Sequence, residues 1–578
     1  MRYIFFLLLA ACSLSSRNPK DNPRPEKQPV KRTAAEKKAL WQKQADTIQV
    51  AFGNSSTRYE ADVPPPGATT KSWEITAWKG ERVHTQVLIW GRKAEPGLLV
   101  VATALTNEKG EMIPLENIFT GQVKPVWTDE YRDGCGYRTS TDFDSSQVAD
   151  LIDTKTKFFR MSPDSLVAVW VSIQVGAETP AGLYNGYVVV NGSKPHILPV
   201  SVKVLDRALP APAAWKYQLD LWQHPAAIAR VQKLKLWSDE HFKAMKPYYQ
   251  MLAAAGQKAI TASIVNEPWG HQTYDDYPSL VKWTKKKDGS WVFDYSLFDK
   301  YVQFTMDCGI NKWIHCYSMV PWKIAFSYYD ETIGRDTVFT DGIGTAEYNR
   351  FWTVMLSDFT KHLKEKGWFE KTAISMDERP MAAMKAVIEL LKKIDDKWKV
   401  TLAGGYHAEV EADIFDYCLA SAEHFPPDVL ARRKQEGKLS TWYTCCSEKF
   451  PNGFTFSPPD EHVWMGWYTA AKGLDGYLRW AFNSWPQNPN TDSRFTAWPG
   501  GDTYQVYPGP LTSIRFEKMV EGVQDFEKIQ FLKKFYAEKK MQKELAELET
   551  VLAGFNIPSL ATTPASKQLE KAKLLLNK

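Results

Sequence analysis

Two adjacent carboxylates, Asp377 and Glu378, are the residues in this chain best suited to acid–base chemistry. The stretch 374–376 before them has strand-like character, and Pro380 after them fits the first turn of a helix. Apolar residues then recur at helical spacing through position 394. This pattern predicts a strand–loop–helix unit that places both acids at the carboxyl end of the strand. The alternative is structural, because acids before a helix also act as caps and dipole partners.

The adjacency of the two acids limits the chemistry that they can perform. Glycoside hydrolysis usually needs two carboxyl groups that face each other across the sugar, about 5 Å apart for retention and roughly 6.5–9.5 Å apart for inversion. Neighbouring residues at a strand end point in divergent directions. They therefore suit substrate-assisted catalysis, in which one acid protonates the leaving oxygen, the other holds the 2-acetamido group, and the acetamido oxygen is the nucleophile. Neighbouring carboxylates also raise one pKa, which helps to keep an acid protonated.

The elements around the acids follow a repeated strand–loop–helix rhythm from residue 216 onward. Helix-like segments, such as 241–255, 297–308, 346–366 and 462–472, lie between most of the strands. Eight such units fit a distorted (β/α)8 TIM barrel over residues 211–510, with short gaps around strands five to seven. The segment 266–293 is long and rich in Trp, Tyr, Gly and Lys, and we expect a binding loop there. The eight strand candidates are 217–222, 259–265, 312–318, 373–376, 400–404, 416–421, 440–444 and 476–480.

Polar and aromatic side chains gather at the predicted strand ends, where a barrel holds its chemistry. A lone His or Tyr at such a place is more often a structural hydrogen-bonder, so the set carries more weight than any member. The candidates for substrate contact are Trp222, His224, His315, Tyr317, Tyr406, His407, Tyr443, Trp480, Asn483 and Trp485.

The parts of the chain on either side of the barrel have different patterns. Residues 41–210 contain short, partly alternating strand candidates and turn signals, which predict an antiparallel β-sandwich that ends at the Pro-rich stretch 209–213. Residues 511–578 are helical and rich in Lys and Glu; we expect them to pack on the outside of the barrel with a solvated charged face. The predicted fold class is therefore α/β: a sandwich, a barrel and C-terminal helices.

The N-terminus is typical of an export signal, with a basic start, an apolar run too short to cross a bilayer, and then Cys12. Leu9-Ala10-Ala11-Cys12 resembles a bacterial lipoprotein signal, which implies a signal peptide over 1–12, lipidation of Cys12, and a membrane-anchored protein in the periplasm or at the cell surface. The alternative is an ordinary secretory signal with an incidental cysteine. Residues 13–40 are polar and read as a flexible tether.

Composition excludes several classes of partner. The chain has 72 basic and 67 acidic residues without a long basic block, so we expect no nucleic-acid partner. The 23 Trp residues suit stacking against sugars, although Trp also fills large cores. Neither Cys-x-x-Cys nor His-Glu-x-x-His occurs, so we expect no zinc site. Cys308, Cys316 and Cys418 are expected to be buried thiols, and the neighbours Cys445 and Cys446 cannot bridge each other without strain.

The acid pair at the fourth barrel strand resembles the catalytic pair of glycoside hydrolase family 123, which are exo-acting β-N-acetylgalactosaminidases. The resemblance extends over residues 45–530 and includes the segments 78–82, 180–186, 464–467, 473–485, 501–508 and 513–525. It implies that Glu378 is the general acid and then the general base. It also implies that Asp377 orients the acetamido group and stabilises an oxazolinium-like intermediate, that the anomeric configuration is retained, and that no metal or organic cofactor is needed.

Within that resemblance, strand-end position makes Trp480 and Trp485 candidates for a sugar platform, and Tyr406, His407 and Asn483 candidates for hydroxyl contacts. The leading hypothesis is a lipid-anchored enzyme that removes terminal β-linked N-acetylgalactosamine from glycans such as glycolipid head groups. One alternative is a glycosidase that prefers N-acetylglucosamine or another 2-acetamido sugar. Another is a non-catalytic, glycan-binding surface lipoprotein, against which the acid pair argues.

Overall fold

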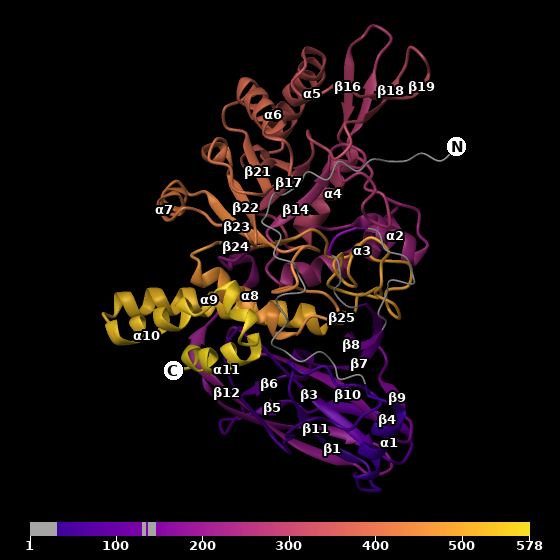
Figure 1. Cartoon of the computed structure of the whole chain (residues 1–578), viewed down its shortest axis with the longest axis vertical. Helices are drawn as coiled ribbons and strands as arrows, with labels where there is room; N and C mark the ends of the chain where they lie inside the picture. The colour runs from indigo at the N-terminus through magenta and orange to yellow at the C-terminus, as the bar shows by residue number, and fades with distance from the viewer. Residues whose placement is uncertain (1–31, 130–133, 137–145) are drawn as a thin grey trace.

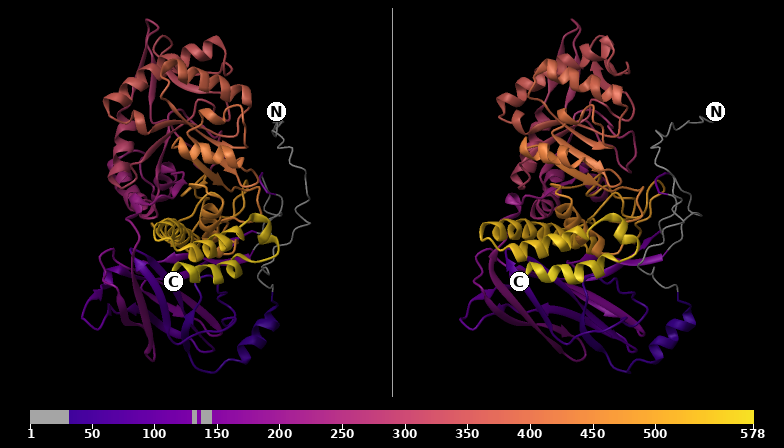
Figure 2. Two further views of the ribbon diagram at one scale, coloured as in Figure 1. Left: turned by 90° about the vertical axis from the view of Figure 1, so that its left-hand side faces the viewer. Right: turned by 60° about the vertical axis from the view of Figure 1, so that its left-hand side comes forward.

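The computed structural model describes residues 32–129, 134–136 and 146–578. The predicted signal peptide, Cys12 and most of the predicted tether lie outside these residues. A barrel and a sandwich occupy opposite ends of the molecule, and the C-terminal helices lie between them (Figures 1 and 2). Within the described ranges, no helix combines the length and the apolar character that crossing a membrane requires.

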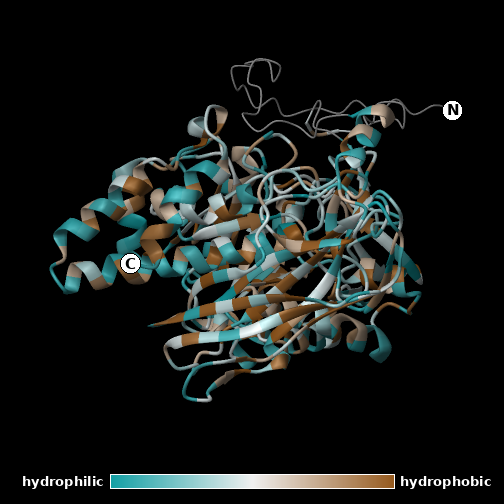
Figure 3. Cartoon of the chain, turned by 90° about the horizontal axis from the view of Figure 1, so that it is seen from below, coloured by the Kyte–Doolittle hydropathy of each residue, from teal (hydrophilic) through white to brown (hydrophobic). Residues whose placement is uncertain are grey.

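The N-terminal part is a two-sheet sandwich, as its alternating strands predict, and apolar and polar residues alternate along them (Figure 3). Its pairs are antiparallel apart from β2 with β12, which is parallel. One sheet has the order β1 (Gln49–Gly53), β3 (Arg82–Gly91), β10 (Ser165–Gln174), β7 (Ile118–Thr128), β8 (Ser146–Asp153) and β25 (Thr512–Ser513). The other has the order β2 (Trp73–Lys79), β12 (His196–Ala208), β11 (Gly182–Asn191), β4 (Glu95–Ala102) and β9 (Phe158–Met161), with β5 (Leu105–Thr106) and β6 (Met112–Ile113) beside it.

Eight parallel strands form the barrel, and each lies within two residues of its predicted position. In chain order they are β13 (Gln218–Leu221), β14 (Ala259–Ser263), β17 (Trp313–Tyr317), β20 (Thr372–Met376), β21 (Lys399–Gly404), β22 (Asp416–Ala420), β23 (Leu439–Tyr443) and β24 (Gly476–Arg479). The helices are α2 (Pro225–Gln232), α3 (Asp239–Ala254), α4 (Ser296–Asp307), α5 (Ala346–Glu365), α6 (Met381–Ile394), α7 (Pro427–Gln435) and α8 (Asp460–Ala471).

The barrel is distorted at one seam, between β13 and β14. Leu219 of β13 bridges instead to Gln257, which lies two residues before β14 begins. Glutamine side chains replace the missing ladder: Leu221 N donates to Gln257 Oε1 at 2.9 Å, and Thr261 N donates to Gln223 Oε1 at 2.9 Å. Buried backbone groups are thereby satisfied where the sheet would otherwise be open.

Part of the predicted binding loop 266–293 is regular structure, which corrects that expectation. Here β15 (Lys282–Lys285) and β16 (Trp291–Asp294) join β18 (Phe326–Asp330) and β19 (Arg335–Phe339) in a four-stranded sheet. This sheet projects from the end of the barrel that lies farthest from the sandwich (Figure 1). The aromatic residues 283–293 pack against α5 rather than facing a ligand, as in the stacking of Trp283 on Phe351.

Two expectations about the ends of the described chain are also corrected. Helix α1 (Ala34–Gln42) occupies the end of the predicted tether; its capping box, Thr33 with Glu36, and the burial of Trp41 explain why this polar stretch is ordered. At the C-terminus, α9 (Ile514–Glu538), α10 (Gln542–Ala553) and α11 (Ala565–Leu576) lie between barrel and sandwich. They pack on barrel helix α8, as expected. Most charged residues between Arg515 and Lys528 of α9, however, are buried and paired rather than solvated; Lys528, for example, bonds to Glu81 of the sandwich at 2.5 Å.

Candidate active site

The acid pair lies directly after β20, the fourth barrel strand, and α6 begins three residues beyond Glu378. Met376 is buried, Asp377 is partly buried and Glu378 is exposed. The two carboxyl groups diverge, as neighbouring strand-end residues do. Asp377 contacts the loop after the third strand, whereas Glu378 contacts the ends of the fifth and seventh strands.

Asp377 is held in an aromatic setting. The indole Nε1 of Trp322 donates to Asp377 Oδ2 at 3.2 Å, and the Arg379 guanidinium lies 5.2 Å from the centre of the Trp322 ring. The pKa of Asp377 is raised to about 6, chiefly by burial and also by the neighbouring Glu378, while Trp322 and Arg379 oppose the shift. Asp377 is therefore a carboxylate at neutral pH that protonates a little below it.

Glu378 is held from across the barrel mouth. The phenol of Tyr443, at the end of β23, donates to Glu378 Oε1. Burial, together with the charge of Glu378, raises the pKa of Tyr443, so this hydroxyl remains a donor. Gly404, at the end of β21, lies beside the Glu378 side chain, since a Cβ there would be in van der Waals contact with Glu378 Cγ at 3.4 Å. One carboxyl oxygen is thus fixed while the residue stays open to solvent.

Aromatic residues form a buried cluster near the carboxyl ends of the barrel strands. We call Trp222, Trp269, Tyr277, Tyr317 and Tyr443 the mouth cluster; Trp480 packs at its edge. The ring centres of Trp222 and Trp269 are 4.8 Å apart, as are those of Trp269 and Tyr317. Among the described residues, Trp222 Nε1 has no hydrogen-bond partner although it is buried. A substrate hydroxyl is the kind of acceptor that this group lacks.

Two of the predicted contact residues, His224 and Asn483, bind each other instead of facing the mouth. The Asn483 amide accepts from His224 N and donates to His224 O, both at 2.9 Å. The His224 ring stacks on Tyr277 with centres 3.8 Å apart, and burial lowers its pKa to about 3. This reciprocal pair joins the ends of the first and eighth strands, which is a structural role and corrects the prediction.

His315 and Trp485 are also internal. His315 Nδ1 lies 3.0 Å from Asp220 Oδ2 inside the barrel. Trp485 is fully buried, donates from Nε1 to Val506 O at 2.7 Å and packs on Tyr248. Trp485 therefore cannot be the sugar platform. Tyr406 and His407 lie partly buried beyond β21, and their hydroxyl contacts stay predictions.

Sequence reasoning missed Trp322 and Trp498. Trp322 is 43% exposed beside Asp377. Trp498 meets Trp480 edge-on, with ring centres 5.2 Å apart. Both lie in loops without a periodic pattern, so only their residue type, in a chain rich in Trp, could have drawn attention to them. The sequence also gave no sign of the disulfide between Cys135 and Cys446, whereas Cys308, Cys316 and Cys418 are buried free thiols as expected.

One group of side chains near the mouth has the composition of a metal site. Glu267, His271 and Asp276 lie within 4.8 Å of one another. Their contacts shape the loop after β14: Glu267 accepts from His271 N at 3.0 Å, and His271 Nδ1 lies 3.0 Å from Asp276. His271 and Asp276 are exposed.

Comparisons with known proteins agree with this geometry. The family model described as "Glycoside hydrolase 123, catalytic domain" matches residues 222–532, and "Glycoside hydrolase 123 N-terminal domain" matches residues 52–192. No curated protein sequence matches. A family 123 glycoside hydrolase from Clostridium perfringens, solved in a study of glycolipid glycan hydrolysis, is 25% identical with a TM-score of 0.81, covering 92% of this chain and 99% of that one.

A second solved structure is much less similar. The GH5 xyloglucanase of Bacteroides ovatus is 9% identical with a TM-score of 0.28, over 82% of this chain and 100% of that one, and says nothing about the site. The family models carry the assignment, because the catalytic model alone spans more than half of the chain and contains the acid pair. This chain is a glycosidase and belongs to glycoside hydrolase family 123.

Proposed function

We propose that the protein is an exo-β-N-acetylgalactosaminidase that retains anomeric configuration by substrate-assisted catalysis. The observation that carries the proposal is the divergence of Asp377 and Glu378 toward separate partners. Carboxyl groups arranged in this way cannot face each other across one sugar ring, so neither is well placed as a nucleophile opposite the other. A substrate that supplies its own nucleophile resolves this difficulty.

In the first step, Glu378 protonates the glycosidic oxygen while the acetamido oxygen attacks the anomeric carbon. The hydrogen bond from Tyr443 fixes Glu378 Oε1, which leaves Oε2 to carry the transferred proton. Asp377 accepts the acetamido N–H and balances the positive charge of the oxazolinium ion; its pKa of about 6 keeps it ionised at neutral pH. In the second step, Glu378 removes a proton from a water molecule that attacks the anomeric carbon. This attack opens the oxazolinium ring and gives a product with the anomeric configuration of the substrate.

The family and the similar solved structure support a proposal for the substrate class. The Clostridium perfringens enzyme is described as acting on glycolipid glycans. We propose a similar substrate here, a glycan with terminal β-linked N-acetylgalactosamine. A glycosidase that prefers N-acetylglucosamine or another 2-acetamido sugar is the second candidate, because the contacts around Asp377 would serve either C4 epimer.

Localisation remains a proposal, namely an exported lipoprotein anchored through Cys12 in the periplasm or at the cell surface. The disulfide between Cys135 and Cys446 supports export, because such bonds persist in oxidising compartments. Labelling with a radioactive fatty acid, lost in a Cys12→Ala variant, tests the anchor.

Two measurements test the activity. Nitrophenyl N-acetyl-β-galactosaminide and nitrophenyl N-acetyl-β-glucosaminide differ only at C4, so their relative kcat/KM decides between the first two candidates. Faster turnover of the glucosaminide would reject the proposed N-acetylgalactosaminidase. An acetamido-thiazoline derivative of the sugar mimics the cyclised intermediate. In a crystal, its ring nitrogen should lie against Asp377, and a ring turned away from Asp377 would contradict the mechanism.

A further inference from the structure

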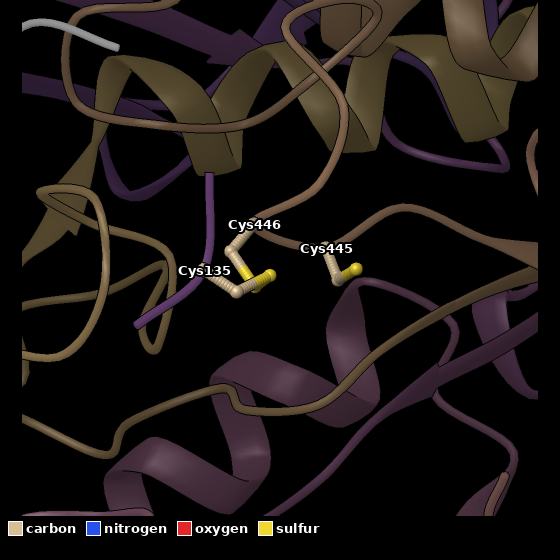
Figure 4. Close-up of side chains that lie close together, drawn as sticks. All are labelled: Cys135, Cys445 and Cys446. Carbon is tan, nitrogen blue, oxygen red and sulfur yellow. A yellow bond between two sulfur atoms is a disulfide. The ribbon is translucent and has the colours of Figure 1, made fainter. Parts of the chain in front are cut away.

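Residues of the sandwich contact the loops at the rim of the barrel mouth. Between β7 and β8, Cys135 is bonded to Cys446, which lies three residues after Tyr443 (Figure 4). In the same segment between β7 and β8, Asp129 Oδ1 accepts from Gly500 N at 2.7 Å, and Gly136 N donates to Ala497 O at 3.1 Å. Part of the sandwich therefore holds residues 491–500, a loop that follows the eighth barrel strand.

That loop carries Trp498, which continues the aromatic surface of the mouth. Trp498 stands edge-on against Trp480, and its Nε1 donates to Gln272 O at 2.8 Å. Trp480 packs against the mouth cluster and donates from Nε1 to Asp502 Oδ2 at 3.1 Å. Both Trp residues are partly exposed, whereas Trp222 and Trp269 are buried. The aromatic surface thus runs from the enclosed cluster beside the acids to the rim.

We propose that Trp480 and Trp498 form a subsite for the sugars of the leaving group, and that the Cys135–Cys446 disulfide and Asp129 are its positioning elements. The proposal rests on the proposed exo function. The terminal sugar must occupy the enclosed mouth beside the acids, so the next sugars pass over the rim. Partly exposed indole faces suit the apolar C–H faces of those sugars. The sandwich would then determine how long glycans bind, without touching the reacting atoms.

A third sulfur beside the disulfide provides a matched control. Cys445 is on the same loop, within 4.8 Å of the other two sulfurs, and remains a free thiol (Figure 4). Burial and the nearby Glu448 raise the pKa of Cys445, so it is a poor nucleophile toward the disulfide at neutral pH. Replacing Cys445 changes a sulfur in this loop and leaves the link to the sandwich intact.

The test compares kcat/KM for an oligosaccharide, carrying at least two sugars beyond the terminal N-acetylgalactosamine, with kcat/KM for the nitrophenyl glycoside. In Cys135→Ser, the ratio of oligosaccharide to nitrophenyl values should fall about tenfold, mainly through KM, as expected for loss of one well-placed aromatic contact. Trp498→Ala should lower the same ratio. Cys445→Ser should keep it. A phosphine reductant should lower the ratio in wild type, because Cys135 is exposed and the reductant can reach the disulfide. The ratio of Cys135→Ser should not change on reduction, because this variant lacks the disulfide.

Equal losses on both substrates in Cys135→Ser, or an unchanged ratio, would overturn the proposal, since the disulfide would then only stabilise the fold. Failure of the proposed function looks different: wild type would not hydrolyse the nitrophenyl N-acetyl-β-galactosaminide at all. Calorimetric binding of the free leaving-group oligosaccharide then tests the subsite without hydrolysis. Weaker binding to Cys135→Ser than to wild type or Cys445→Ser supports it, and equal binding contradicts it.

Discussion

Glu378 and Asp377 are neighbours in sequence, yet their partners lie on opposite sides of the barrel mouth, and this separation predicts different responses to the leaving group. A general acid matters most when the leaving oxygen is basic. Glu378→Gln should lower kcat/KM by roughly 10²–10⁴-fold on an oligosaccharide and far less on a dinitrophenyl glycoside, whose leaving group needs no proton. Asp377→Asn should impair both substrates similarly. Steady-state kinetics on the two substrates checks this, and a uniform loss in Glu378→Gln would remove its role as acid.

Asp377 also predicts a pH dependence. Its pKa is raised to about 6, so the active carboxylate is lost as the pH falls through that value, and kcat/KM should show an acidic limb near pH 6. The Trp322 hydrogen bond lowers this pKa. In Trp322→Phe, the pKa should therefore rise and the limb should move to higher pH, while a ring remains for Arg379 to stack on. A limb that stays in place would show that another group controls it.

Sequence could identify Asp377 and Glu378 because the neighbouring strand and helix patterns are local. It could not assign Asn483, because the residue type at a strand end does not say whether the amide faces a ligand or, as here, the backbone of His224. The role of Trp322 could not be predicted for a related reason. Its role depends on the meeting of loops from two different strands, which no local pattern records.

At the scale of elements, helices α8 and α9 cross at two glycines, and this crossing is a sensitive point of the fold. A Cβ on Gly466 would lie 2.0 Å from Gly522 O, and one on Gly522 would lie 2.7 Å from His462 O. Gly466→Ala must separate the helices, so we expect a loss of about 3 kcal/mol or more in the free energy of unfolding, at the high end for overpacking. Gly522→Ala should cost less.

Gly97→Ala is the control for this crossing, because a Cβ there meets no atom within 4 Å. Its free energy of unfolding, measured with denaturant, should stay within about 0.5 kcal/mol of wild type. If Gly466→Ala were equally mild, the close approach of α8 and α9 would not exist in solution.

The barrel strands were predictable because buried parallel strands are short apolar runs separated by helical periodicity. The charged α9 was not, because its pattern is the one that a solvated helix would show. Its buried charged residues are accommodated because partners from the sandwich and from α11 meet them there, as Lys573 does with Asp525 at 2.6 Å. The same limit applies to the disulfide, whose cysteines are separated by 311 positions.

At the scale of the whole molecule, Asp150 joins the two large parts of the chain. This fully buried carboxylate of β8 accepts from Arg515 Nε at 2.9 Å and from Tyr507 at 2.7 Å, and pairs with Arg58 at 3.0 Å. Although burial alone would raise the pKa of Asp150, the two guanidinium groups lower it below its usual value. Because this pKa is depressed on folding, the stabilisation is present above about pH 4 and is lost as the pH falls further toward the folded-state pKa.

Asp150→Asn keeps the shape but leaves Arg58 and Arg515 buried without their counter-ion, so we expect a loss of about 3–5 kcal/mol at pH 7. Denaturant unfolding at several pH values measures this loss. The deficit relative to wild type should stay constant from pH 7 to about pH 4 and shrink below that, because the unfolded chain then takes up a proton that the folded carboxylate does not. A deficit independent of pH would mean that packing at this site, rather than the ion pairs of Asp150, joins the two parts.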